Sequence, residues 1–95
     1  MQNKLLTLKL EDRNLVKDNL DTIMDKVYDL IADKYLNNDV EIEITNIDIV
    51  RFGIEGIDQR TMCNNLDLVY GKMVDSGYNV TLFSDSTSEY IQVSV

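Results

Sequence analysis

The 95-residue sequence contains no histidine, no proline, no tryptophan and a single cysteine. The absence of histidine removes the usual general base of enzymes and the commonest metal ligand. It also excludes Ser-His-Asp and Cys-His catalytic arrangements, and zinc sites built from cysteine and histidine, within one chain. The lone cysteine, Cys63, cannot form an internal disulfide, so the sequence is not that of a secreted disulfide scaffold. We therefore expect a protein that is not an enzyme and that has no catalytic residue, no metal site and no cofactor.

Three remaining patterns that could carry chemistry each have a structural explanation. The segment Gly53-Ile54-Glu55-Gly56 lacks the third glycine of a dinucleotide fingerprint and the Gly-Lys-Ser/Thr of a P-loop, so we interpret its glycines as turn residues. Cys63 has no histidine to activate its thiol and fits a position at the edge of the core. The polar segment 85–89 lacks the ligand spacing of an EF-hand and is typical of a hairpin turn.

The charge balance is strongly acidic, with 17 Asp and Glu residues against 9 Lys and Arg, for a formal net charge of −8. The basic residues are scattered and form no stripe that could neutralise phosphates, which argues against direct binding of nucleic acid or of an anionic membrane. The N-terminal segment lacks the apolar run of a signal peptide, and no apolar run approaches the length of a membrane span. These absences predict a cytoplasmic protein.

The first third of the chain shows two hydrophobic periods. Lys4 to Leu10 alternates between leucines and polar residues, which predicts a half-buried strand. From about Asp12 to Leu36 the apolar residues recur at steps of three and four, which predicts one long amphipathic helix with Asp12 or Asn14 as its N-cap.

The middle of the chain is ambiguous. Residues 40–45 alternate between apolar and polar side chains and predict a strand with an acidic outer face. For residues 46–57 we favour another strand, because β-branched residues dominate and two glycines bound the run. The alternative is a short helix capped by Thr45 or Asn46.

In the last third, Asp58 is positioned to cap a second helix that extends to about Ser76, with Gly77 after its end. The apolar residues expected to form its buried stripe are Met62, Leu66, Val69, Tyr70 and Met73. Residues 78–84 and 89–95 then predict two strands joined by a hairpin turn. The predicted fold is a single α+β domain over residues 1–95, in the order β-α-β-β-α-β-β. A mainly antiparallel sheet of four to five strands would have both helices packed on one face.

One pattern in the first predicted helix points to a function. Five aspartates fall within a sector of about 120° at roughly 100° per residue, opposite the apolar stripe of the same helix. They form what we call the acidic ridge: Asp18, Asp21, Asp25, Asp29 and Asp33. Like charges at i,i+4 cost a few tenths of a kcal/mol each, and Asp is a poorer helix former than Glu. Selection for stability alone would not favour this face, although a merely solvated face of an acidic protein remains the alternative.

We therefore predict a non-enzymatic, acidic protein-binding domain. The acidic ridge, extended by Glu41 and Glu43, would mimic the phosphates of a nucleic acid and block the basic site of a nucleic-acid-binding enzyme. The alternative is a structural module that self-associates, for example as a homodimer, through an open sheet face or an edge strand such as Tyr90–Val95. A small enzyme that uses Asp, Glu, Tyr or Cys63 is the least favoured reading.

The size, the acidity and the Asn/Asp/Ile-rich composition are similar to those of small proteins from low-GC bacteria and their phages. That group contains DNA mimics and inhibitors of host enzymes. The likeness lies in composition over the whole chain and carries no diagnostic motif. It is consistent with a phage- or mobile-element-type inhibitor and assigns no role to any residue.

Overall fold

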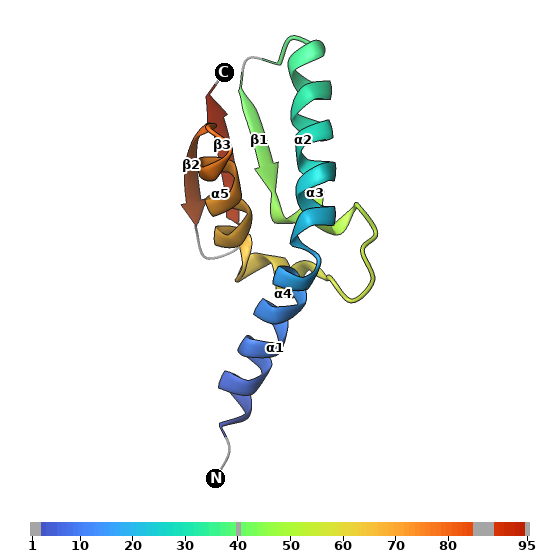
Figure 1. Ribbon diagram of the computed structural model, residues 1–95, viewed down its shortest axis with the longest axis vertical. Helices are drawn as coiled ribbons and strands as arrows, with labels where there is room; N and C mark the ends of the chain where they lie inside the picture. The colour runs from blue at the N-terminus through green and yellow to red at the C-terminus, as the bar shows by residue number, and fades with distance from the viewer. Residues whose placement is uncertain (1–2, 40, 85–88, 95) are drawn as a thin grey trace.

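The computed structural model describes residues 3–39, 41–84 and 89–94, and Figure 1 shows its arrangement. Its elements are α1 (Lys4–Asp18), α2 (Leu20–Leu36), β1 (Ile42–Thr45), α3 (Asn46–Val50), α4 (Gln59–Cys63), α5 (Leu66–Asp75), β2 (Asn79–Ser84) and β3 (Glu89–Ser94). The α+β class is as predicted, but the described residues are mostly helical and form a small sheet of three antiparallel strands. The predicted order β-α-β-β-α-β-β and the sheet of four to five strands are therefore wrong.

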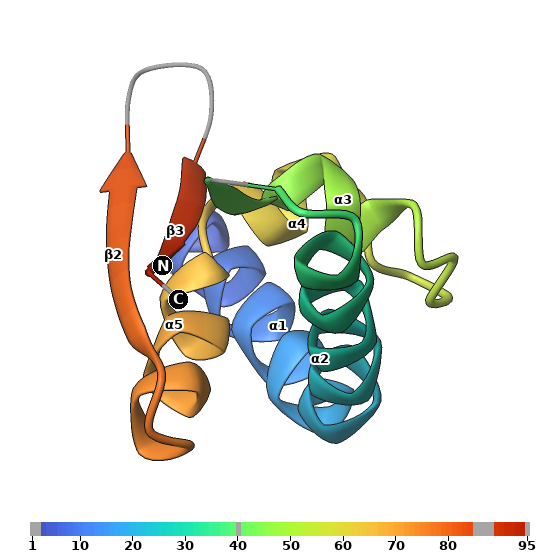
Figure 2. The same cartoon turned by 90° about the horizontal axis from the view of Figure 1, so that it is seen from above.

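The sheet has the strand order β1-β3-β2, so the last strand in sequence is the central one. Ile91 of β3 lies opposite Ile44 of β1 on one side and Leu82 of β2 on the other. Helices α2 and α5 pack against the same face of this sheet, as predicted for the two helices (Figure 2). The hypothesis that Tyr90–Val95 is an edge strand is wrong, because both sides of β3 are already paired; the edges are β1 and β2.

The prediction of a strand over Lys4–Leu10 is wrong. This segment forms the first half of the helix α1. The Asn3 side chain caps this helix by accepting a hydrogen bond from the Leu6 backbone N–H at 3.3 Å. Leucine and lysine are strong helix formers, and no described strand is available to pair with this segment and stabilise an extended conformation. Its alternating leucines are all exposed, so the alternation in the sequence does not correspond to a buried face in the structure.

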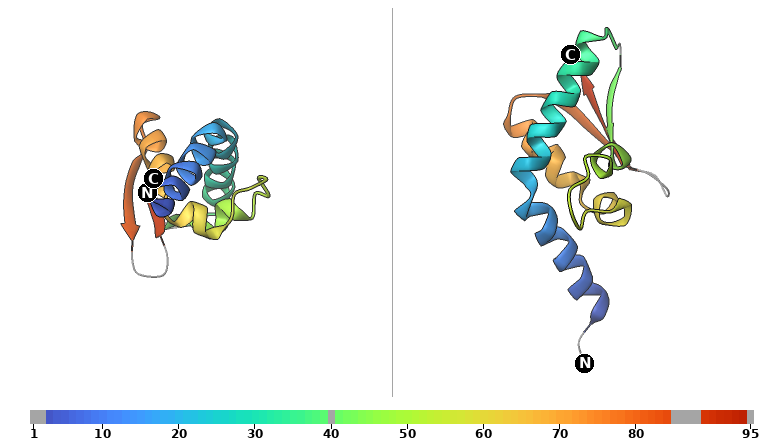
Figure 3. Two further views of the ribbon diagram at one scale, coloured as in Figure 1. Left: turned by 90° about the horizontal axis from the view of Figure 1, so that it is seen from below. Right: turned by 90° about the vertical axis from the view of Figure 1, so that its right-hand side faces the viewer.

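The predicted long helix over residues 12–36 is interrupted at Asn19, where α1 ends and α2 begins. The Asn19 side chain donates a hydrogen bond to the Leu15 carbonyl at 2.9 Å, and its backbone N–H also turns back to the last carbonyls of α1. Asparagine competes for backbone groups in this way and commonly ends helices. The two helices follow one another along the chain with a bend between them (Figure 3).

Residues 46–50 form the short helix α3, so the favoured strand over 46–57 is wrong and the alternative helix is correct. Thr45 is its N-cap: the Thr45 hydroxyl accepts from the Asp48 N–H at 3.1 Å, and the Asp48 carboxylate accepts from the Thr45 N–H at 2.9 Å. This reciprocal capping box satisfies two donors that a strand would have offered to a neighbour.

The second predicted helix begins after Asp58 as expected, but it is divided into α4 and α5 at Asn64–Asn65. The Asp58 carboxylate accepts from the Thr61 N–H at 2.8 Å, and this hydrogen bond lowers the pKa of Asp58. The buried Asn65 side chain donates to the Thr61 carbonyl at 2.7 Å, which offers the chain an alternative to continuing the helix. Gly77 adopts a φ of 91° after α5, as predicted for a helix-ending glycine.

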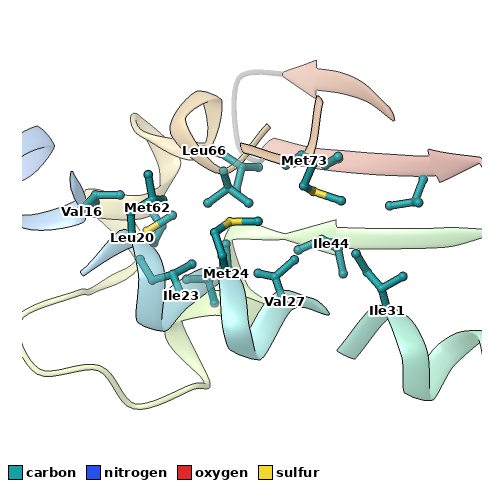
Figure 4. Packing of buried hydrophobic residues seen from close by; sticks show 14 of the residues in the cluster. Val16, Leu20, Ile23, Met24, Val27, Ile31, Ile44, Met62, Leu66 and Met73 are labelled. Carbon is teal, nitrogen blue, oxygen red and sulfur yellow. The ribbon is translucent and has the colours of Figure 1, made fainter. Parts of the chain in front are cut away.

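The hydrophobic core joins the inner face of the sheet to α2, α4 and α5. Figure 4 shows its central side chains: Val16, Leu20, Ile23, Met24, Val27, Ile31, Ile44, Met62, Leu66 and Met73. The predicted apolar stripes of both helices are therefore largely confirmed as core. One polar residue is buried beside this apolar core: the side-chain amide of Asn46 is fully buried and has no hydrogen-bond partner among the described residues.

Candidate functional site

All five carboxylates of the acidic ridge are exposed in the structure. Four of them lie along α2, while Asp18 is the last residue of α1, on the other side of the bend at Asn19. The opposite side of α2 carries the fully buried Ile23 and Val27. The ridge is therefore a row of four carboxylates on one straight helix, with a fifth placed just before its start.

No ridge carboxylate is neutralised by a cation within the described residues. The ion pairs there are Arg13 with Asp67 at 2.9 Å and Arg60 with Asp12 at 3.1 Å, and both connect α1 to the α4–α5 segment. Lys26 and Lys34 lie on α2 itself but form no ion pair with the ridge. The negative charge of the ridge is thus available to a partner.

The helix that carries the ridge is firmly held. Its inner face packs on β1 and α5, and Tyr28 stacks on Tyr78 with ring centroids 5.6 Å apart. The Tyr28 hydroxyl also forms a hydrogen bond with the Ser76 hydroxyl at the end of α5. Because α2 is fixed in this way, its four aspartates are displayed at a constant spacing of about 6 Å per i,i+4 step and extend over roughly 18 Å.

Glu41 and Glu43 are both exposed, and the structure places Glu43 away from the ridge. Ile42 and Ile44 point into the core beneath α2, so Glu43 between them points to the opposite face of the sheet. Glu43 there lies opposite Gln92 of β3. The structure therefore places Glu43 on the outer face of the sheet, away from the carboxylates on α2.

A polar cleft of about 260 Å³ lies between α1 and the α4–α5 segment, lined by Lys9, Asp12, Arg13, Asn64 and Asn65. Its main charged groups already bind one another. The two terminal guanidinium nitrogens of Arg13 both donate to Asp67, at 2.9 and 3.2 Å, and this hydrogen bonding raises the pKa of Arg13. Arg13 also contacts the Asn65 side chain at 3.4 Å. We interpret the cleft as part of the contact that holds α1 against the α4–α5 segment, and not as a ligand site.

The other residues considered from sequence do not form a site. Gly53 and Gly56 have φ values of 73° and 82° and serve the turns between α3 and α4. Cys63 is half-buried at the end of α4. The hairpin residues 85–88 lie outside the described residues.

The sequence interpretation missed one surface, the leucines of the first half of α1. Leu5, Leu6, Leu8 and Leu10 are 46–61% exposed, although the alternation predicts Leu6, Leu8 and Leu10 on the buried face of a strand. A helical interpretation of Lys4–Leu10 would have placed these leucines on both sides of Lys9 around the helix, so that one neighbouring element could not bury all of them.

Within residues 3–39, 41–84 and 89–94, no three His, Cys, Asp or Glu side chains are grouped so that they could hold a metal ion. None of the helices in this part of the chain is both long and apolar enough to span a bilayer. No protein-family model, no curated protein and no solved structure matches this chain.

Proposed function

We propose that this chain is a non-enzymatic protein-binding domain whose acidic ridge occupies the basic nucleic-acid-binding groove of another protein and blocks it. The observation that carries the proposal is the ridge itself. Its carboxylates are exposed, have no cation partner among the described residues, and lie mainly on a helix that the core holds in place. An array of this kind attracts a cationic groove and does not have to reorganise when it binds.

The spacing of the ridge supports nucleic-acid mimicry. Successive carboxylates along α2 are about 6 Å apart, a separation close to that of neighbouring phosphates on one strand. Lys and Arg side chains arranged to contact a run of phosphates could therefore contact a run of aspartates in the same register. Binding of this kind is fast and weakens steeply with salt, because exposed charges are screened by ions.

Direct binding to DNA is less well supported. Short helices followed by a β-hairpin could present a helix to the major groove, as helix-turn-helix proteins do. The exposed charged residues of α4 and α5 are Arg60, Asp67, Lys72 and Asp75, so this surface has no net positive charge. A protein needs several Lys or Arg contacts to neutralise phosphates, and these helices do not provide them.

The test compares two triple variants with the same change in charge. Asp21, Asp25 and Asp29 are replaced by lysine in the ridge variant, and Asp39, Glu41 and Glu43 in the control. Each protein is used as bait in a lysate of the native cell, and captured nucleic-acid-binding proteins are then titrated in competition with labelled duplex DNA. We expect the ridge variant to lose at least about 100-fold in affinity and the control about 10-fold or less.

A salt titration completes this test. The affinity of the wild-type protein should fall at least about tenfold between low and physiological salt, because the interaction depends on exposed charges. A partner that binds both triple variants equally well, or that binds independently of salt, would show that the ridge is only a solvated helix face.

The alternative function, self-association through the sheet, has one observation in its favour. Phe83 and Tyr90 stack on the outer face of the sheet with ring centroids 5.0 Å apart, and Phe83 is exposed. The neighbouring positions Thr81, Gln92 and Glu43 are polar, however, and the edge strand β1 has only four residues. The outer face of the sheet is therefore mostly polar, and self-association through it is the less well supported function.

A further inference from the structure

The two edges of the sheet are covered to different degrees. On β1, the inner-facing Ile42 and Ile44 are fully buried, and α2 packs against that strand. On β2, the inner-facing Val80 and Leu82 pack against the core but are only partly buried. Figure 2 shows β2 on the side of the molecule away from α2. The apolar inner face of the sheet therefore stays partly exposed along β2.

The backbone on the outer side of β2 has no strand to pair with among the described residues. The order β1-β3-β2 leaves that side without a neighbour, and no backbone group of another described element bonds to Asn79–Ser84. An extended strand directs alternate N–H and C=O groups to its two sides. Strand β2 thus presents to solvent a row of donors and acceptors that an added strand can pair with.

Strand β2 also lacks the features by which natural edge strands avoid such pairing, which are short length, charge, proline and bulges. It has six residues, and its sequence NVTLFS contains no charge and no proline. Its register with β3 is continuous from Asn79 to Ser84, without a bulge. Strand β1, in contrast, has four residues and carries the exposed Glu43. Of the two edges, β2 is the one suited to bind another strand.

We propose that β2 pairs with β2 of a second copy of this chain, antiparallel across a two-fold axis, so that two three-stranded sheets become one continuous sheet. An axis perpendicular to the sheet requires residues that lie opposite one another to come from the same face of β2. With Thr81 on the axis, Val80 lies opposite Leu82 twice on the inner face, and Thr81 lies opposite Thr81 on the outer face. Apolar pairs and threonine pairs both stabilise antiparallel strands.

The distribution of charge favours a second copy at this edge. Two molecules with a net charge of −8 repel one another, but Asn79–Ser84 is uncharged, so no like charges lie opposite one another in the strand pair. The acidic ridge lies mainly on α2, which packs on β1 at the opposite edge of the sheet. The dimer therefore keeps the two ridges apart and leaves both of them exposed.

The contact is small, because it pairs one six-residue strand from each copy and covers only the exposed parts of a few side chains. It therefore belongs with the weak, reversible interfaces. Main-chain hydrogen bonds provide most of the affinity in strand addition of this kind, and the facing side chains determine the register.

The first test measures the mass of the full-length protein by sedimentation equilibrium up to high micromolar concentration. The wild-type protein should dimerise reversibly. Thr81→Lys places two lysines side by side on the axis and should raise the dissociation constant at least about fivefold, although it reduces the net negative charge of each copy. The matched control is Gln92→Lys, which makes the same change of charge directly opposite Thr81 on the central strand and should alter the dissociation constant less than about twofold.

The salt dependence separates this proposal from the function of the acidic ridge. Added salt should strengthen the dimer, because it screens the repulsion between two acidic copies. The same change should weaken binding of the ridge to a basic partner. The two ideas can therefore fail independently of one another.

The second test locates the contact by amide hydrogen exchange. The β2 amides that do not bond to β3 should exchange more slowly at concentrations where the dimer forms, while the amides of β1 should not change. A wild-type protein that stays monomeric at high micromolar concentration in high salt would overturn the proposal. A dimer that Thr81→Lys and Gln92→Lys weaken equally, or one that protects no amide of β2, would overturn it as well.

Discussion

Helices α1 and α2 are consecutive and similar in length, at 15 and 17 residues, but they serve the molecule differently. Helix α2 buries five apolar residues and directs its aspartates to solvent, while α1 fully buries only Val16 and leaves four leucines exposed. The sheet and α5 cover α2, whereas no described element buries the leucines in the first half of α1. Of these two helices, α2 therefore contributes more to the stability of the fold.

The largest expected effect is the difference in stability between a substitution in α2 and one in the first half of α1. Ile23→Ala in α2 should lower the free energy of unfolding by about 2–5 kcal/mol, because it removes a fully buried side chain and leaves a cavity. Leu6→Ala in α1 should change it by less than about 0.5 kcal/mol, because this side chain is exposed. Urea denaturation of both variants measures the difference. Equal losses would mean that the first half of α1 is part of the core after all.

The next effect concerns a buried polar side chain in the core. Asn46 is fully buried and its amide has no hydrogen-bond partner among the described residues. Asn46→Leu should raise the free energy of unfolding by about 1–2 kcal/mol, because it replaces an unsatisfied polar group with an apolar one of similar size. The same change at the exposed Asn64 should give no gain. Destabilisation by Asn46→Leu would indicate that the amide has a partner that the structure does not show.

A smaller effect concerns the anchor between α1 and the body. Arg13→Ala removes the two hydrogen bonds to Asp67 and should cost about 0.5–1 kcal/mol, because both side chains are partly exposed. Hydrogen exchange should accelerate in α1 and remain unchanged in α2. Arg13→Lys should restore only part of the protection, because lysine cannot form the same bidentate contact. Lys9→Ala, which removes a neighbouring charge without a hydrogen bond in the structure, is the control.

The smallest effect concerns the way the helices begin. Helix α2 starts without a side-chain cap, whereas Asp58 caps α4 and has a lowered pKa because its carboxylate accepts the Thr61 N–H. A carboxylate with a lowered pKa stabilises the fold above its unfolded pKa and loses this effect as the pH falls through the folded value, which lies below 3.8. Asp58→Asn should therefore remove part of the loss of stability in acid, as measured by thermal unfolding at a series of pH values.

Glu89 should show the opposite pH dependence. Burial raises its pKa above the ordinary 4.5, with a further contribution from the charge of Asp67. A carboxyl group with a raised pKa favours folding most when it is protonated, so its contribution declines as the pH rises through the interval above 4.5. Glu89→Gln should flatten the curve in that interval. If the two variants shifted the pH curve in the same direction, the assigned causes would be wrong.

The sequence predicted the covered part of the molecule better than the exposed part. The stripes of α2 and α5, the strands near residues 42–45, 79–84 and 89–94, and the cap at Asp58 follow periodicity and local chemistry, and the structure contains them. The breaks at Asn19 and Asn64–Asn65 depend on asparagine side chains that turn back to carbonyls four residues earlier. Hydrophobic periodicity does not predict where an asparagine side chain will bond to the backbone and end a helix.

The two errors in secondary structure have different causes. In Lys4–Leu10, the alternation of leucines with polar residues predicted a strand with one buried face. The leucines are exposed, so this alternation did not indicate burial against a sheet. In residues 46–50, the β-branched residues Ile47 and Ile49 suggested a strand, but the capping box of Thr45 and Asp48 determined the local structure. Of the candidate site, the sequence predicted the exposure of the ridge. It could not show that Glu43 lies on another face, because that depends on how β1 pairs with β3.

The central position of β3 has a consequence for the order in which the protein folds. Strands β1 and β2 make no ladder with each other, and both pair with Glu89–Ser94, which the ribosome adds after them. During synthesis α1 and α2 can form as local helices, while the inner isoleucines of β1 must wait for Ile91 and Val93 to emerge. The sheet is therefore completed late, and a nascent chain stalled before residue 89 should resemble a loose helical intermediate that a protease cleaves readily.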